Sequence, residues 1–287
     1  MIRSRTADAD ALNQGREQLS TATFTALRDL LHAHSGIALA SHKLTMVQSR
    51  LAKRLRALGI QTYEEYLQRL ENPESPEWSE FINALTTNLT SFFREGHHFT
   101  QLVPLIKPFH AASRRIRIWS AGCSTGEEPY TLAMTLLQGF GSGATIQILA
   151  TDLDTAVLET AARGVYPEAR IEGLDDSWKR LAFLKGAGAQ QGQVRVRPDL
   201  RQLITFRQMN LLDERWSVPE APFQAIFCRN VMIYFDKPTQ RRLLKRYHDL
   251  LEPDGLLFVG HSEALLDASL GFQSLGQTIY RRREAAP

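Results

Sequence analysis

The segment of residues 115–130 constrains the fold of this chain more than any other. Alternating isoleucines at its start indicate a short buried strand, and Gly122 and Gly126 then indicate a tight turn. A helix is predicted to begin near Glu127, because Pro129 suits a first helical turn and apolar residues follow at helical spacing. A strand that runs through a glycine turn into a helix exposes backbone N–H groups, which a ligand can approach closely.

Two carboxylates, Glu127 and Glu128, stand at the predicted start of this helix. Carboxylates there suit the positive end of the helix dipole, but they would repel a phosphate group. The crevice is therefore predicted to bind a ligand that carries hydroxyl groups or positive charge, in preference to a pyrophosphate.

Three interpretations of the turn are open. It could be an ordinary strand-to-helix connection, or the cofactor loop of an S-adenosylmethionine-dependent methyltransferase. It could also be the nucleophile elbow of a hydrolase, because residues 122–126 match G-x-S-x-G, with Ser124 as nucleophile and His261 downstream. An elbow normally follows several strands, whereas residues 1–110 are predicted to be mostly helical, and this weighs heavily against the hydrolase.

Composition limits the class of protein. The chain has 287 residues, of which 43% are hydrophobic and 23% charged, as is typical of soluble globular proteins. The net charge of +3 is too small to argue for nucleic-acid binding. Cys123 and Cys228 lack zinc-ligand spacing and indicate a reducing compartment. Without a signal sequence or a membrane-spanning run, a cytoplasmic location with no membrane insertion is expected.

The first part of the chain is predicted to be helical. Residues 1–19 are expected to form a flexible N-terminus, residues 20–90 a small all-α domain, and residues 91–114 a linker helix.

One helix of this all-α domain is rich in basic residues. No Asp or Glu occurs between Asp29 and Glu64, and most of the cations in that stretch fall on one flank, beside the apolar stripe. The flank could be an ordinary solvated face or a docking surface for an acidic partner. Like charges at i,i+3 and i,i+4 repel one another and cost stability, which favours the docking surface. The basic residues are Lys43, Arg50, Lys53, Arg54 and Arg56.

Residues 115–287 are predicted to form an α/β domain. A strand at residues 145–152 ends in Asp152, a carboxylate placed to bind a ribose diol. Such a carboxylate fits NAD binding almost as well, but the G-x-G-x-x-G pattern typical of NAD-binding domains is absent. Further strands alternate with helices and end in an antiparallel hairpin around Gly276. This order fits the doubly wound, mostly parallel sheet of a class I methyltransferase.

An antiparallel β-subdomain is predicted as an insertion at about residues 164–202, where the alternation of strand and helix breaks. Its two strands are expected at residues 181–188 and 193–197, joined by a loop from Gly186 to Gly192. At least one edge would be exposed, and an exposed edge can bind a peptide as an added strand.

Several motifs of the chain are specific in combination: Asn88–Glu95, Ser120–Tyr130, Ala150–Asp154, Asn210–Leu212, Cys228–Phe235 and Gly260–Glu263. Through them the chain resembles the chemotaxis receptor methyltransferase (CheR) family, from about residue 20 to residue 282. The resemblance implies methylation of glutamate side chains on the cytoplasmic helices of chemoreceptors. It also implies S-adenosylmethionine as the cofactor, with no metal.

The resemblance also implies roles for single residues. Arg94 and Tyr234 match positions that face the transferred methyl group, and the match favours Glu128 over Glu127 as a cofactor contact. The family's cofactor contacts, carried onto this sequence, are Asn88, Thr90, Arg94, Glu128, Asp152, Asn210, Leu211, Arg229 and Asn230.

Partners follow from the same resemblance. The basic helix would dock the receptor, and the loop Gly186-Ala187-Gly188 looks like the family's binding loop for a C-terminal receptor peptide. A monomer without a nucleic-acid partner is expected. A hydrolase that acts through Ser124 and a non-catalytic, cofactor-binding adaptor stay as alternatives.

Overall fold

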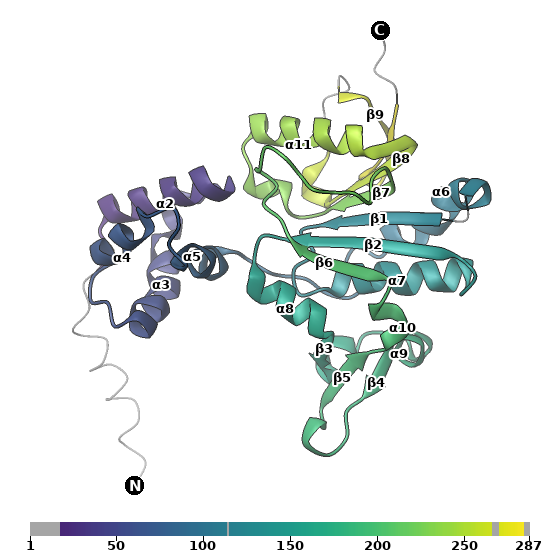
Figure 1. Ribbon diagram of the computed structural model, residues 1–287, viewed down its shortest axis with the longest axis horizontal. Coiled ribbons are helices and arrows are strands. Elements are labelled where there is room, and N and C mark those ends of the chain that lie inside the picture. Colours follow the sequence, from purple (N-terminus) through teal and green to yellow (C-terminus); the bar gives the residue numbers. More distant parts are fainter. Residues whose placement is uncertain (1–17, 114, 266–269, 284–287) are drawn as a thin grey trace. The chain divides into compact units, whose positions relative to one another are not determined.

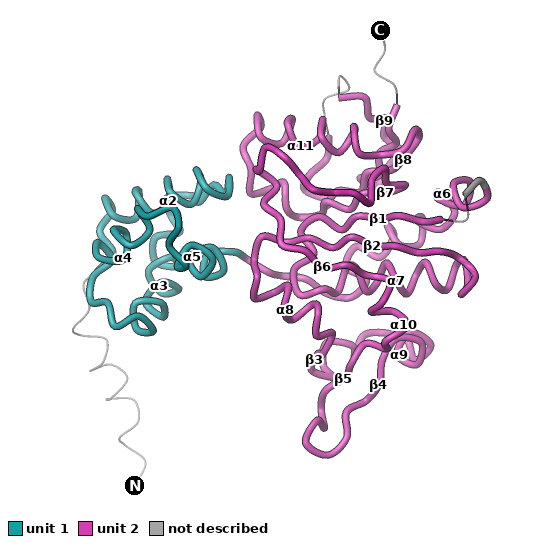
Figure 2. The backbone as a smooth tube through the Cα atoms, in the orientation of Figure 1, with its two compact units in different colours: residues 1–86 teal, residues 87–287 magenta. Residues whose placement is uncertain are grey.

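The computed structural model describes residues 18–113, 115–265 and 270–283. The chain divides into two compact units, residues 1–86 and residues 87–287, which Figure 2 shows in separate colours. The boundary falls after Thr86, whereas the sequence placed the end of the helical domain at residue 90. The expected flexible N-terminus lies almost entirely outside the described residues.

The described part of the first unit consists of helices and the short connections between them. Ser20 caps its first helix by accepting a hydrogen bond from the Thr23 N–H at 3.1 Å, and Gly59 ends the basic helix in the left-handed conformation. Leu27, Leu51 and Tyr66 are fully buried between the helices. The elements are α2 (Thr21–Ser35), the 3-10 turn η1 (Ser41–Lys43), α3 (Leu44–Leu58), α4 (Tyr63–Leu70) and α5 (Glu77–Leu85).

A buried carboxylate joins three helices of this unit. Glu77, at the start of α5, is only 5% exposed and accepts two hydrogen bonds at 2.8 Å from the Arg54 guanidinium of α3. The Tyr66 hydroxyl of α4 donates to the same carboxylate at 2.9 Å. Arg54 also pairs with Glu80 at 2.8 Å, but Glu80 is 49% exposed. The bond to Glu77 therefore carries most of the stabilisation, because water screens the other pair.

The second unit is built on a seven-stranded sheet with the order β6-β2-β1-β7-β8-β10-β9 (Figure 1). The five strands from β6 to β8 pair in parallel, and β10 runs antiparallel to both β8 and β9. This confirms the predicted class I methyltransferase sheet with its C-terminal hairpin. The strands are β1 (Arg115–Ala121), β2 (Thr145–Asp152), β6 (Ile204–Gln208), β7 (Phe223–Cys228), β8 (Leu251–Val259), β9 (Phe272–Gly276) and β10 (Ile279–Arg282).

Helices cover both faces of this sheet, and the alternation of side chains along β1 separates two cores. Ile116 and Ile118 face the core that the sheet shares with the helices of residues 97–113 and 127–140. Trp119 points to the other face and packs against Tyr247 of the helix of residues 237–250, with ring centroids 5.5 Å apart. The helices are α6 (His97–Ser113), α7 (Glu127–Phe140), α8 (Thr155–Arg163) and α11 (Lys237–Leu250).

The helix that the sequence predicted as a linker, α6, lies within the second unit. Phe99, Leu102 and Ile106 of α6 are buried in the core that this helix shares with β1 and α7. A helix with three core residues at helical spacing gains its stability from tertiary packing, which a linker could not supply.

The inserted β-subdomain has three strands in the order β3-β5-β4, all antiparallel, where the sequence predicted two. The predicted strand at residues 181–188 is wrong at its start, because Leu181 and Ala182 end a helix, α9 (Asp176–Ala182). The short β3 was missed because three residues show no periodicity. The strands are β3 (Val165–Pro167), β4 (Phe183–Lys185) and β5 (Gln193–Val196), and α10 (Pro198–Arg201) follows them.

We predict that Glu77→Gln destabilises the helical unit by about 2–4 kcal/mol, because an amide cannot accept from both Arg54 nitrogens and leaves this part-buried cation with only the water-screened Glu80 as its ionic partner. The matched variant Glu80→Gln should cost less than about 0.5 kcal/mol. Urea unfolding followed by helical circular dichroism measures both. Equal losses in the two variants would contradict this account of the cluster.

Candidate active site

The carboxyl ends of the parallel strands carry the predicted site residues on their loops. The turn after β1 is held against β2, because the N–H groups of Gly122 and Cys123 both donate to the Thr151 carbonyl, at 2.8 and 2.9 Å. Gly122 has φ +91°, and a Cβ there would lie 2.3 Å from the Val231 side chain. Glycine is therefore required at this position, where the loops after β1 and β7 pack together.

The two acids at the start of α7 have different surroundings. Glu127 is fully buried, forms an ion pair with Arg170, and accepts a hydrogen bond from the Thr125 hydroxyl at 2.6 Å. The Glu128 side chain is 14% exposed, and accepts from the Ser120 hydroxyl at 2.7 Å and from Arg229 at 3.1 Å. Glu127 is therefore enclosed by structural contacts, and Glu128 is the more exposed of the two acids.

Arg229, at the end of β7, is the central cation of the site. Its guanidinium lies between Glu128 and Glu95, 3.1 Å from the first and 3.4 Å from the second. It also donates to the Arg94 carbonyl and lies over the Phe99 ring, 5.3 Å from the centroid. Burial raises the pKa of Glu128, and Arg229 opposes that shift. Burial acts to raise the pKa of Glu95, but the Arg229 charge and the neighbouring His261 ring outweigh burial, so this pKa is lowered.

Asp152 ends β2, as predicted. Its carboxylate accepts from the backbone N–H of Ser124 at 2.8 Å and from that of Asp154 at 3.0 Å. Burial nevertheless raises the pKa of Asp152 to about 6, because these two hydrogen bonds do not offset the loss of water. A ligand that donates hydroxyl protons would favour the ionised form.

The segment before α6 lies beside this acid. The Asn88 amide donates to Asp154 at 2.7 Å, and the Ser124 hydroxyl donates to the Asn88 carbonyl at 3.4 Å. The Arg94 guanidinium donates to the Leu89 carbonyl at 2.6 Å, which folds the segment back on itself. Hydrogen bonds thus join Asn88 to the Asp152 loop through Asp154 and Ser124.

Thr90 is tied to α7 through its backbone. The Thr90 carbonyl accepts from Arg170 at 3.0 Å, and Arg170 is also the ion-pair partner of Glu127. Thr90 itself is partly exposed.

Asn210 and Leu211 follow β6. The Met209 N–H donates to the Asp152 carbonyl at 2.9 Å, which places the next two residues beside the end of β2. The Asn210 side-chain oxygen accepts from the Leu212 N–H at 2.9 Å, and Leu211 is 8% exposed.

The loop after β7 carries Asn230 and Tyr234, and one acid organises it. Glu263, in the 3-10 turn η5 (His261–Glu263), accepts from the N–H groups of Asn230 and Gly260 at 2.7 Å each and of Ile233 at 3.1 Å. Asn230 has φ +60°, a left-handed conformation that these bonds hold in place. Tyr234, at the end of η4 (Met232–Tyr234), is partly exposed.

The hydrolase alternative lacks its geometry. The Ser124 hydroxyl donates to the backbone carbonyl of Asn88, and the Nδ1 atom of His261 lies 3.2 Å from Glu95. Among the described residues no contact joins Ser124 to His261, so no triad forms. No cluster of three or more metal-ligating side chains occurs in the described ranges either.

The predicted docking helix divides its cations into two groups. Arg50 donates to the carbonyls of Ala84 and Thr86 at 3.3 and 2.7 Å, and Arg54 binds Glu77. Both arginines therefore hold the helical unit together. Lys43, Lys53 and Arg56 are exposed.

Comparison with known proteins bears directly on this site. The model "CheR methyltransferase, SAM binding domain" matches residues 88–281, and "CheR methyltransferase, all-alpha domain" matches residues 22–86. The chain belongs to the CheR methyltransferase family. It is an S-adenosylmethionine-dependent methyltransferase of chemotaxis, and the non-catalytic adaptor has no support.

Curated relatives agree with the family models. A "chemotaxis protein methyltransferase" from Klebsiella aerogenes is 49% identical over 269 residues, covering 92% of this chain and 91% of its own. "Chemotaxis protein methyltransferase 2" from Pseudomonas aeruginosa is 50% identical, covering 90% and 91%. The Escherichia coli "chemotaxis protein methyltransferase" is 47% identical, covering 92% of each chain. No helix in the described part of the chain has the length and apolar character to cross a membrane.

Three acids with clear structural roles were missed as site residues. Glu95 and Glu263 hold Arg229 and the loop after β7, and Asp154 binds Asn88 while it caps α8. All three stand inside the motifs that carried the resemblance. Their partners lie up to 134 residues away along the chain, as for Glu95 and Arg229, so no local pattern could identify these contacts.

We predict that Glu263→Gln costs about 1–3 kcal/mol in the free energy of unfolding, because one amide oxygen cannot replace two carboxylate oxygens that accept three N–H groups. The control Glu168→Gln breaks an exposed pair with Lys185 and should cost less than about 0.5 kcal/mol. Thermal unfolding measures both. A Glu263→Gln protein as stable as the control would contradict the positioning role.

Proposed function

We propose that this protein methylates glutamate side chains on the cytoplasmic helices of chemoreceptors, in the cytoplasm, and that it forms methyl esters. The strongest support is the arrangement at the strand ends, where two desolvated carboxylates adjoin a segment that carries the partly exposed Arg94. The relatives' name, chemotaxis protein methyltransferase, supports a chemotaxis protein as the substrate.

The residues at the strand ends fit S-adenosylmethionine chemically. In this proposal Asp152 accepts from the ribose hydroxyls, Glu128 holds the ammonium group, and Asn210 contacts the adenine edge. Burial raises the pKa of both carboxyls, so each gains from hydroxyl donors or positive charge. The bound cofactor supplies an electrophilic methyl group. The remaining proposed contacts are Asn88, Thr90, Arg94, Leu211, Arg229 and Asn230.

The substrate needs little acid–base help. A solvent-exposed glutamate has a pKa near ~4.3, so at pH 7 it is already the nucleophile. The protein's task is then to align the carboxylate with the methyl group, which can lower the barrier by roughly 7–11 kcal/mol. In this proposal Arg94 and Tyr234 orient that carboxylate. The bond from Arg94 to Leu89 fixes the guanidinium, which favours positioning over strong binding of the nucleophile.

Radiolabelled methyl transfer to chemoreceptor cytoplasmic fragments tests this function. We expect label on the fragments that mild base releases, as esters require. Label that resists base would point to a different acceptor atom. An active preparation that binds S-adenosylhomocysteine but labels no receptor fragment would contradict the proposal.

We propose that receptor docking uses Lys43, Lys53 and Arg56, whose side chains are exposed. Replacing all three with Gln should raise the KM for receptor fragments and reduce its salt dependence, because acidic partners are attracted over about 8–10 Å in physiological salt. The affinity for S-adenosylhomocysteine should not change.

The control for this docking test is Arg69→Gln, a loss of an exposed cation on α4 of the same unit. Steady-state kinetics at two salt concentrations separates the variants. An unchanged KM in the triple variant would contradict docking at this helix.

A peptide of the receptor would bind the β-subdomain in this proposal. β4 is an edge strand with Leu184 44% exposed, so its outer side is open to an added strand. Gly186 permits the tight turn after β4, because a Cβ there would lie 2.0 Å from the Gln190 carbonyl, and Gly188 has φ +57°.

We predict that the affinity for S-adenosylhomocysteine falls as the pH is lowered through 6. Above its pKa of about 6, Asp152 is ionised and accepts from the ribose hydroxyls; below it, binding must first remove a proton. The dissociation constant should therefore rise toward about tenfold per pH unit below 6. Asp152→Asn should bind more weakly and lose most of this dependence. A constant affinity from pH 7.5 to 5 in the unmodified protein would contradict the assignment.

A further inference from the structure

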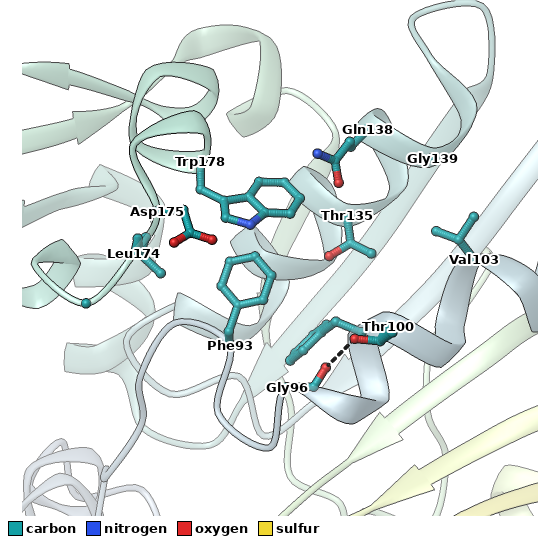
Figure 3. A pocket seen from close by; sticks show the side chains of 12 residues that line it. Phe93, Gly96, Thr100, Val103, Thr135, Gln138, Gly139, Leu174, Asp175 and Trp178 are labelled. Carbon is teal, nitrogen blue, oxygen red and sulfur yellow. Dashed lines mark hydrogen bonds between the residues drawn. The ribbon is translucent and has the colours of Figure 1, made fainter.

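A cavity of about 610 Å³ lies between α6, α7 and the segment that leads into α9 (Figure 3). None of its lining residues belongs to the cofactor or docking residues discussed above. It lies on the side of the sheet that α6 and α7 cover, within the second unit. Its lining residues are Phe93, Gly96, Phe99, Thr100, Val103, Thr135, Gln138, Gly139, Gly173, Leu174, Asp175 and Trp178.

Aromatic rings form one wall of the cavity. The Phe93 ring lies 5.0 Å from that of Trp178 and 5.7 Å from that of Phe99, measured between centroids. Figure 3 shows Phe93 next to Trp178 at the cavity. Trp178 is partly exposed, so part of its surface is open to a ligand. Such rings attract cations and apolar groups.

The mouth of the cavity is acidic. Asp175 is exposed and forms no ion pair among the described residues, and Figure 3 shows its carboxylate beside Trp178 and Phe93. The neighbouring Lys179 does not neutralise it, because its ammonium lies 3.5 Å from Asp176 and donates to the Glu172 carbonyl at 3.1 Å. An unpaired carboxylate next to aromatic rings favours a cation.

Thr135 supplies an independent sign of a ligand. This residue of α7 is 8% exposed, and its hydroxyl has no hydrogen-bond partner among the described residues. Thr131, one turn earlier, shows the normal arrangement, since its hydroxyl donates to the Glu127 carbonyl at 2.6 Å and accepts from the Phe93 N–H. A buried hydroxyl without a partner costs free energy, which a polar ligand atom would recover.

We propose that this cavity is a binding site for a small primary ammonium compound that carries an aromatic or apolar group. The ammonium group lies against the aromatic faces and donates to the Thr135 hydroxyl, and the exposed Asp175 carboxylate attracts it electrostatically. The apolar part lies against Trp178 and Leu174.

Occupancy of the cavity acts on the catalytic segment through Phe93. Phe93 and Glu95 have φ +54° and +53°, so this segment is strained on both sides of Arg94. Arg229 binds the Arg94 carbonyl and Glu95, and it also binds Glu128. A shift of the Phe93 ring is therefore transmitted to the cofactor residues. This coupling rests on the proposed cofactor site, whereas the binding itself does not.

Calorimetric titration of the full chain with benzylamine, a cation at pH 7, tests the binding. Benzyl alcohol, its neutral analogue, should bind about fivefold more weakly or worse. Asp175→Asn and Thr135→Val should each weaken benzylamine by a similar factor. Thr135→Val keeps the side-chain shape, so it tests the site without loss of folding.

The control is Glu172→Gln, which removes a nearby exposed carboxylate that does not line the cavity, and benzylamine should bind this variant normally. Absent binding, equal affinity for benzyl alcohol, or indifference to Asp175→Asn would each overturn the site. For the coupling, saturating benzylamine should change the affinity for S-adenosylhomocysteine about fivefold or more, with the reciprocal effect of equal size. If benzylamine binds but leaves the affinity for S-adenosylhomocysteine unchanged, the coupling alone is overturned. If the protein does not bind S-adenosylhomocysteine even in the absence of benzylamine, the cofactor assignment has failed instead.

Discussion

The guanidinium of Arg229 is the interaction on which the site depends. Its side chain is 2% exposed and lies between Glu128 and Glu95, which come from two different segments of the second unit. Removing Arg229 would leave the Glu128 and Glu95 carboxylates without their shared cation, which costs far more than the pairs contribute. The three groups therefore fix the end of β7, the start of α7 and the segment before α6 relative to one another. The fold places them together because β1 and β7 are adjacent parallel strands.

This constraint also explains the chemistry of the site. Parallel strands deliver their following loops to one edge, and here those loops bring carboxylates out of water. Burial raises the pKa of Glu128 and Asp152, so the edge suits a cationic, hydroxyl-bearing ligand and disfavours a phosphate. Methyl transfer from a sulfonium to an ionised carboxylate requires alignment more than proton transfer.

Sequence reasoning predicted the fold more completely than the site. Hydrophobic alternation and glycine turns identified β1, β2 and the terminal hairpin, because these signals are local. It missed β3 and placed the start of β4 inside α9, because three-residue strands carry no period. The family resemblance favoured Glu128 over Glu127, but the residue pattern alone could not separate these two acids, or Arg54 from Lys53, because each distinction depends on a partner distant in the chain. Arg170 and Glu77 are those partners, and only the tertiary structure reveals them.

A crystal structure of this protein with S-adenosylhomocysteine tests the central claim most directly. The account predicts the ribose hydroxyls on Asp152 and the amino-acid portion on the side of Glu128 and Arg229. Arg229 should keep its contact with Glu95. Ligand bound away from the carboxyl ends of β1 and β2, or an empty pocket at saturating concentration, would contradict the account.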